Sequence, residues 1–216
     1  MTSQPNPFAP HWLIRDIVIG SHRAAVGAGG LLFVGDSLVE GFYWNRIASL
    51  PVLNAGYSGI WTEALEPRVP LLLQSARPGL AMLLVGTNDA KKGCTDDALD
   101  GVMRHFDSIL RHFEEAAVPL VVMTPPPIEA GKRLTGFYAK DAMASLSRRM
   151  VQAAKGRAVA IVDLQRAFAD GDGAAKAGVT TDGIHLSAGA YRRLHDMLER
   201  TIATVTARRG GDQRGA

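Results

Sequence analysis

The chain has 216 residues, which suits one domain with short extensions, and 47% of them are apolar, so a sizeable core can be buried. The net charge is only +3, from 24 basic and 21 acidic residues. The basic residues are spread out, whereas a nucleic-acid-binding surface needs them clustered with stacking aromatics. Cys94 is the only cysteine, which excludes an intramolecular disulfide and a cysteine-based zinc site.

The N-terminal segment is polar and rich in proline through Pro10. It lacks the basic region and following apolar stretch of a secretory signal peptide. No apolar run is long enough to span a membrane. We therefore expect a cytoplasmic protein without membrane insertion. A helix is predicted over Trp12 to Ala25, and residues 1–25 are interpreted as an extension that precedes the main domain, 26–207.

Short apolar runs alternate with longer segments of helical spacing along the rest of the chain. The runs are typical of strands buried on both faces, as in a parallel sheet. Strands that alternate with helices predict a doubly wound α/β domain. The glycine-rich, charged tail, 208–216, is expected to be disordered. The predicted strands are Leu31–Val34, Val52–Leu53, Leu80–Val85, Leu120–Met123 and Val159–Val162, and the further predicted helices are Asp97–Ala117, Tyr138–Ala154 and Ala188–Val205.

The first strand runs into Gly35-Asp36-Ser37-Leu38. Glycine permits a tight turn into a helix, and Ser37 then lies at the helix N-terminus, where free N–H groups favour negative charge. That position suits a nucleophile whose reaction produces an oxyanion. Asp36 or Ser37 could equally be a simple N-cap, so this motif alone does not decide between the two interpretations.

Asp182 stands three residues before His185, in a loop that follows the fifth strand. A carboxylate at this spacing can hold the imidazole through Nδ1 and leave Nε2 free to act as a base. Such spacing is also common on protein surfaces. The other five histidines, His11, His22, His105, His112 and His195, lie in or near predicted helices and are interpreted as structural or solvated.

Two further blocks follow predicted strands. The amide of Asn88, in Gly86-Thr87-Asn88-Asp89, can donate a hydrogen bond to an oxyanion. The glycines of the segment Asn54 to Gly59 let the backbone approach a ligand. Ordinary turn chemistry explains either block by itself. Ligands of doubly wound folds bind beyond the carboxyl ends of the strands, where all of these blocks fall.

Taken together and in this order, the four blocks resemble the SGNH or GDSL hydrolase family. The blocks are Phe33 to Leu38, Asn54 to Gly59, Gly86 to Asp89 and Asp182 to Leu186, so the resemblance spans nearly the whole domain. The leading helix adds a loose similarity to the catalytic subunits of platelet-activating-factor acetylhydrolase. The resemblance implies a three-layer α/β/α sandwich with a five-stranded parallel sheet, the flavodoxin-like SGNH hydrolase fold.

The resemblance also implies a catalytic triad of Ser37 as nucleophile, His185 as base and Asp182 as its orienter. It assigns the oxyanion hole to the N–H groups of Ser37 and Gly59 and the amide of Asn88. No metal or cofactor is implied. Ile60 departs from the acidic residue that many members carry after the block-two glycine. The expected substrate-binding residues, which follow the same strand ends, are Leu38, Tyr57, Ile60, Trp61 and Pro126, with Pro125 to Ile128 around it.

The expected function is therefore hydrolysis of small-molecule esters with short acyl groups. Transfer of the acyl group to a sugar or alcohol uses the same residues, and a catalytically silent binding module is a further alternative. The α/β-hydrolase elbow is excluded because Gly35-Asp36-Ser37-Leu38-Val39 lacks its second glycine. No nucleic-acid partner is expected, and the sequence leaves open whether the chain forms homo-oligomers.

Overall fold

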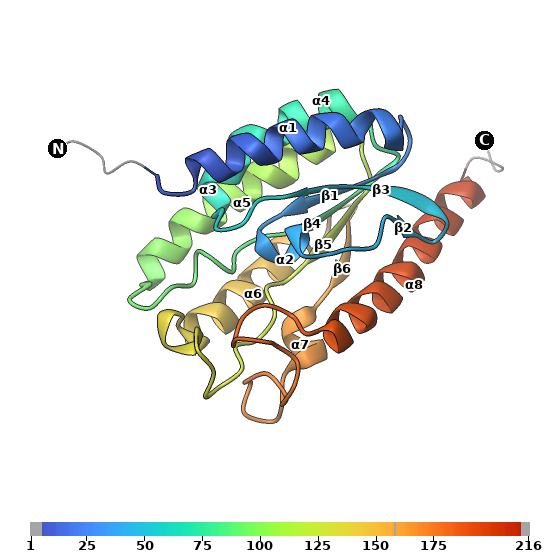
Figure 1. Ribbon diagram of the computed structural model, residues 1–216. Helices are drawn as coiled ribbons and strands as arrows, with labels where there is room; N and C mark the ends of the chain where they lie inside the picture. The colour runs from blue at the N-terminus through green and yellow to red at the C-terminus, as the bar shows by residue number, and fades with distance from the viewer. Residues whose placement is uncertain (1–5, 158, 213–216) are drawn as a thin grey trace.

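The computed structural model describes residues 6–157 and 159–212. Within these residues a six-stranded sheet runs in the order β2-β3-β1-β4-β5-β6 (Figure 1). Its five longer strands are parallel, and only the short β2 pairs antiparallel, with β3. The strands are β1 (Leu31–Gly35), β2 (Arg46–Ile47), β3 (Leu50–Gly56), β4 (Leu80–Leu84), β5 (Leu120–Met123) and β6 (Val159–Val162).

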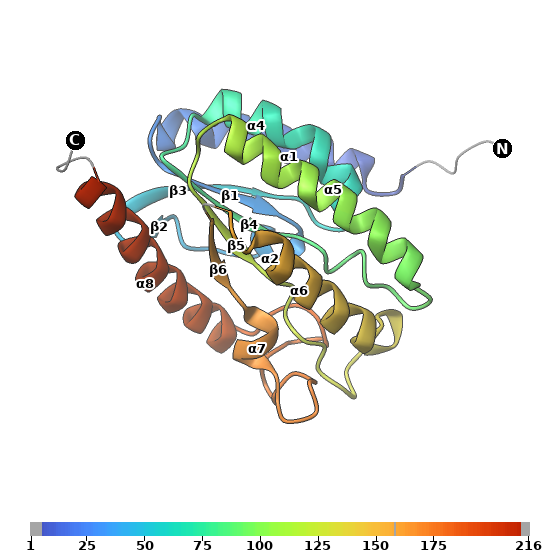
Figure 2. The same ribbon diagram turned by 180° about the vertical axis from the view of Figure 1, so that it is seen from behind.

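Helices cover both faces of the sheet and complete three layers (Figures 1 and 2). On one face, the helices α1, α4, α5 and α6 share a core with the sheet, and on the other face α2, α7 and α8 do so. The helices are α1 (Ala9–Val26), α2 (Ser37–Glu40), α3 (Thr62–Leu65), α4 (Val69–Ala76), α5 (Asp96–Glu115), α6 (Lys140–Ala154), α7 (Leu164–Phe168) and α8 (Ala188–Asp212), with 3-10 turns η1 (Glu66–Arg68) and η2 (Thr135–Phe137).

The apolar run of β1 explains why this strand lies at the centre. Successive side chains of a strand point to opposite faces, and here both faces are covered. Leu32 and Val34 enter the core on the α1 side, whereas Leu31 and Phe33 enter the core on the α8 side. All four side chains are at most 1% exposed. A strand buried on both faces therefore reads as a continuous apolar run.

The structure confirms the five predicted parallel strands and the α/β/α sandwich. It adds β2, whose two residues form a hairpin edge too short to give a sequence signal. The helix predicted to end near Val205 continues as α8 through Asp212, which is within the tail that is expected to begin at Arg208. The remaining residues of the tail, 213–216, lie outside the described residues. No described helix combines the length and apolarity needed to cross a bilayer.

The N-terminal helix α1 is packed into the domain and does not extend away from it. It lies along β3, and its Trp12 and Ile19 are each only 5% exposed in the core that they share with α4 and α5. Arg15 reaches from α1 to the end of β3, where it donates hydrogen bonds to the carbonyls of Gly56 and Asn54 at 2.8 and 3.1 Å. The helix thus braces the carboxyl end of β3.

The strand order locates the expected binding edge. Without β2, the order is that of the flavodoxin-like sheet, in which ligands bind outside the carboxyl ends of the strands, at the point where the winding reverses. Here the chain winds from β1 to β3 on one side and from β4 outward on the other. The switch point therefore lies between the ends of β1 and β4, the two strands that precede Ser37 and Asn88.

Candidate active site

Ser37 stands at the first position of α2, directly beyond the end of β1. Asp36 is the N-cap, with extended backbone, and its Oδ1 accepts a hydrogen bond from the N–H of Leu38 at 2.9 Å. Gly35, the last residue of β1, lets the strand end pass close to β4, because a Cβ there would lie 1.9 Å from the carbonyl oxygen of Leu84. The N-cap role considered for Asp36 is thus real, and it leaves the Ser37 hydroxyl free for another partner.

That partner is His185, whose Nε2 lies 2.9 Å from Ser37 Oγ, although 148 residues separate the two in sequence. The other ring nitrogen, Nδ1, lies 2.7 Å from Asp182 Oδ2. Because a carboxylate can only accept, Nδ1 carries the proton, and Nε2 is then the acceptor for the serine O–H. The three residues form one chain of hydrogen bonds in the orientation that general-base activation of a serine requires.

Backbone N–H groups hold the carboxylate of Asp182 in place. Its Oδ1 accepts from the N–H groups of Ile184 and His185 at 3.1 and 2.9 Å. Burial raises the pKa of Asp182, but the hydrogen bonds from the His185 ring and from these two N–H groups outweigh it and lower the pKa below its ordinary value. Asp182 therefore stays ionised beside the imidazole.

Asn88 and Gly59 lie on neighbouring loops that are tied together. Asn88 Nδ2 donates to the carbonyl of Ile60 at 2.9 Å, and its Oδ1 accepts from the Tyr138 hydroxyl at 3.4 Å. These two contacts fix which way the amide faces, and among the residues that the structure describes the second N–H of Nδ2 donates to no other group. Gly59 has φ +76, and a Cβ there would meet the Phe8 ring at 2.5 Å, so only glycine fits.

Glu40 links the serine helix to the loop that carries Gly59. It ends α2, and its Oε2 accepts from the N–H of Ser58 at 2.6 Å and faces His11 Nε2 at 3.0 Å. Arg15 Nε approaches the same oxygen at 3.9 Å. Burial raises the pKa of Glu40, but the contacts with His11, Ser58 and Arg15 lower it overall. An ionised carboxylate thus joins α1, α2 and the loop after β3.

The residues expected to bind substrate are mostly in the core. Leu38 and Ile60 are 0% exposed and Tyr57 is 1% exposed, so none of these three side chains can line an open pocket. Pro126 is also buried, and Trp61 is part-buried against the core. These side chains are apolar contacts that hold the backbone of the neighbouring site residues in place, so the assignment of these residues to substrate binding stays a prediction.

Sequence reasoning missed several polar residues around the site. Tyr138 precedes α6, and no strand end marks it, so only its contact with Asn88 reveals it. Asp89 accepts hydrogen bonds from the N–H and hydroxyl of Thr62 at 3.1 and 2.9 Å and so ties the loop after β4 to α3. Burial raises the pKa of Asp89 to about 6. Its place in the Gly86 to Asp89 block was the one available signal.

Residues 33–193 match the GDSL-like lipase/acylhydrolase family, and this span contains all four blocks described above. The chain belongs to this family. It is similar to thioesterase 1/protease 1/lysophospholipase L1 of Escherichia coli K12, with 29% identity over 141 residues, which cover 59% of this chain. The aligned region covers 66% of that relative, slightly less than two thirds of its length.

Solved structures of the GDSL group share the fold. A GDSL-like lipase from Bacteroides thetaiotaomicron superposes with a TM-score of 0.74 at 17% identity, covering 89% of this chain and 98% of that one. A carbohydrate acetylesterase from Sinorhizobium meliloti gives a TM-score of 0.66 at 19% identity, covering 82% and 99%. The hydrolase fold of this family is therefore present along most of the chain.

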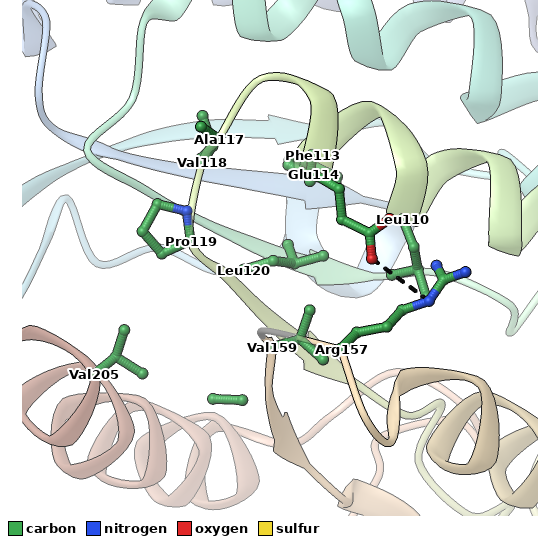
Figure 3. Close-up of a pocket in the computed structure, with 11 residues that line it drawn as sticks. Leu110, Phe113, Glu114, Ala117, Val118, Pro119, Leu120, Arg157, Val159 and Val205 are labelled. Atoms are coloured by element: carbon green, nitrogen blue, oxygen red, sulfur yellow. Dashed lines mark ion pairs between the residues drawn. The ribbon is translucent and has the colours of Figure 1, made fainter. Parts of the chain in front are cut away.

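A cavity of about 570 Å³ lies at the opposite edge of this hydrolase fold (Figure 3). Leu120 and Val159, the first residues of β5 and β6, line it together with Val205 of α8. An ion pair between Arg157 and Glu114, 3.5 Å apart, stands at its wall. Because the cavity adjoins the amino ends of the strands, it is separate from the Ser37 site at their carboxyl ends.

Proposed function

We propose that the protein is a serine esterase that hydrolyses carboxylic esters of short acyl groups through an acyl-enzyme on Ser37. The observation that carries the proposal is the continuous chain from Ser37 Oγ to His185 Nε2 and from His185 Nδ1 to Asp182. The family supplies the broader statement, an acylhydrolase that acts on ester bonds. The ester class and the covalent step are specific to this proposal.

The mechanism follows from the assigned protons. His185 Nε2 takes the proton of Ser37 as Oγ bonds to the ester carbonyl carbon, and the carbonyl electron pair moves onto its oxygen. When the tetrahedral intermediate collapses, His185 gives its proton to the leaving alcohol, and the acyl group remains on Oγ. Water then attacks the acyl-enzyme with His185 again as base, which releases the acid and restores Ser37.

The oxyanion would be held by the N–H groups of Ser37 and Gly59 and the free amide hydrogen of Asn88. Within residues 6–157 and 159–212, neither of the two backbone N–H groups donates to another protein group, so both can face a ligand. Such donors act most strongly on the charge that develops in the transition state. No step in this mechanism requires a metal or an organic cofactor.

Two considerations favour short acyl groups. After Asn88 the chain reaches α5 within a few residues, and after His185 it enters α8 almost at once, so neither of these two connections is long enough to form a lid. A long acyl chain needs an apolar groove, since each buried methylene contributes ~0.8 kcal/mol. The similar fold from Sinorhizobium meliloti is a carbohydrate acetylesterase. The name of the Escherichia coli relative includes lysophospholipase, so the substrates to be tested must include esters of long acyl chains as well.

A series of p-nitrophenyl esters from acetate to palmitate tests the proposal. We expect the highest kcat/KM with acetate and a steady fall as the acyl chain lengthens. Ser37→Ala should abolish turnover and labelling by a fluorophosphonate with an unchanged circular dichroism spectrum, whereas Ser75→Ala, on α4, should leave both intact. A kcat/KM that rises from acetate through octanoate would disprove the short-acyl preference, and full turnover by Ser37→Ala would disprove the mechanism.

A further inference from the structure

Glu129, on the loop after β5, is a buried carboxylate outside the chain of catalytic hydrogen bonds. Its side chain is in contact with the segment that leads to Asp182. Oε1 accepts from the N–H of Gly178 at 2.9 Å and pairs with Lys132 Nζ at 3.0 Å. Oε2 accepts from the N–H and the hydroxyl of Thr180 at 2.7 and 2.8 Å. The residue is only 6% exposed.

The four donors explain why this position holds an acid. Burial raises the pKa of Glu129, but the N–H groups of Gly178 and Thr180, with Lys132 and the Thr180 hydroxyl, lower it to about 2. Only an ionised carboxylate accepts at both oxygens, since an amide presents donors at one end. Glu129 is thus a fixed anion that gathers donors from a segment about fifty residues away.

The hydroxyl of Thr180 connects Glu129 to the turn from Asp182 to His185. While it donates to Glu129, its oxygen accepts from the N–H of Gly183 at 3.0 Å. The carbonyl of Gly183 accepts in turn from the Glu129 N–H at 3.0 Å. Gly183 has φ +111, and a Cβ there would lie 2.7 Å from Thr135 Oγ1, so the turn is closely packed on the same loop.

Gly183 directly follows Asp182 and lies two residues before His185. The hydrogen bonds of its N–H and its carbonyl therefore hold the turn that carries both Asp182 and His185. The Asp182 carbonyl is held by the same loop, through the Leu134 N–H at 2.8 Å. We propose that Glu129 is a positioning residue that acts through Thr180 and Gly183 to aim Asp182 at His185. The proposal rests on the proposed esterase function, because it assigns Glu129 a task in that reaction.

The expected effect is on catalysis because the Asp182–His185–Ser37 chain tolerates little displacement. Misplacing reacting groups by about 1 Å can reduce the rate by ~10²-fold. Glu129 does not touch the reacting atoms, so substrate binding should be preserved. A residue that merely stabilised the fold would instead change the fraction of folded protein and leave turnover by each folded molecule unaltered.

Paired substitutions of Thr180 test the link. Thr180→Val keeps the side-chain shape but removes the hydroxyl that joins Glu129 to Gly183, and Thr180→Ser retains that hydroxyl. Thr201→Val, whose hydroxyl bonds the Met197 carbonyl on α8 at 2.9 Å, is the matched control for the same chemical change elsewhere. For each variant, kcat and KM for an acetate ester are measured, with the folded fraction from circular dichroism. Proton NMR follows the downfield resonance of the His185 Nδ1 proton.

We expect Thr180→Val to lower kcat per folded molecule about 10- to 100-fold with KM unchanged within about twofold, and to shift or broaden the His185 Nδ1 resonance. Thr180→Ser and Thr201→Val should match the wild type. Should Thr180→Val fail to fold, Glu129→Gln provides the same comparison, because it keeps Thr180 and the side-chain volume. Wild-type kcat with an unchanged resonance, or a loss explained by the unfolded fraction, would overturn the proposal.

The two proposals fail in different ways. If the wild-type protein hydrolyses no ester, the proposed function has failed. The resonance of His185 in the wild type, Thr180→Val and Thr180→Ser then still reports whether Glu129 positions the turn. If the wild type is active and Thr180→Val equals it in both kcat and resonance, only the role of Glu129 is disproved.

Discussion

Asp36 provides a test in which the structure gives both the direction and the size of the effect. Its carboxyl group is 0% exposed, and within the described residues only one of its oxygens, Oδ1, has a hydrogen-bond partner, the Leu38 N–H. Burial is the main cause that raises its pKa from 3.8 to about 6. The native state therefore holds this proton more tightly than the unfolded chain does. Asp36→Asn removes the titration and keeps the Oδ1 acceptor.

The pKa difference fixes how stability should change with pH. A carboxyl whose pKa is raised by folding favours the native state most below its unfolded pKa of 3.8, and that contribution is lost as the pH rises through about 6. At ~1.36 kcal/mol per pKa unit, the full loss is about 3 kcal/mol, of which about 1.4 kcal/mol falls between pH 5 and pH 8. The variant has no such loss.

Urea unfolding of both proteins at pH 5 and pH 8 measures this difference. We expect the stability of Asp36→Asn relative to the wild type to rise by about 1.4 kcal/mol between the two values, or roughly 3–6 °C in Tm. A constant offset between the proteins reflects only how well the amide packs, so the change with pH is decisive. A difference that stays constant from pH 5 to pH 8, or that moves in favour of the wild type, would refute the reasoning.

Three further predictions concern the catalytic groups. His185→Ala should nearly abolish turnover and His195→Ala should not, because only His185 lies within hydrogen-bond distance of Ser37 Oγ; equal damage from both variants in a p-nitrophenyl acetate assay would contradict the assignment of His185 as the base. Asn88→Ala should lower kcat by about 10²–10³ with little change in KM; an effect on KM alone would make it a binding residue. Glu40→Gln should lower kcat by a smaller factor than Asn88→Ala, because it loosens the Gly59 loop and removes no oxyanion donor; steady-state kinetics that show unchanged kcat would contradict this.

The layers of the fold were predictable because of the way burial shapes sequence. Strands covered on both faces must be apolar throughout, and α5 carries Leu99, Phe106 and Phe113 along one buried stripe. Each of these elements can therefore be recognised from its own stretch of sequence. The strand order and the hairpin edge β2 were not predictable, since they depend on pairings across the chain. The short helices α2, α3 and α7 span too few turns to show a period.

In the site, too, residues that are close in sequence could be predicted to interact, whereas contacts between residues far apart in sequence could not. Asp182 and His185 are three residues apart, and the carboxyl ends of parallel strands lie at one edge of a sheet whatever the strand order. A meeting of the blocks at that edge could therefore be anticipated. The contacts of Glu129 join it to residues about fifty positions away, mostly through backbone N–H groups that any residue could supply. Such a partner set leaves no pattern in the sequence, and only the folded chain reveals it.

The two halves of the site are each held by a separate carboxylate, the buried Glu129 and the part-buried Glu40, and Glu40 connects its half to the N-terminal helix. Glu129 fixes the turn that carries the acid–base pair, whereas Glu40 fixes the loop that carries Gly59. Contacts with His11, Ser58 and Arg15 lower the pKa of Glu40, and α1 supplies two of these three partners, His11 and Arg15. A segment that sequence reasoning treats as an extension thus contacts the loop that carries part of the proposed oxyanion hole. Arg15 also binds the carbonyls at the end of β3. Loss of α1 would therefore remove the α1 partners of the Glu40 carboxylate and the contacts to the end of β3 at the same time.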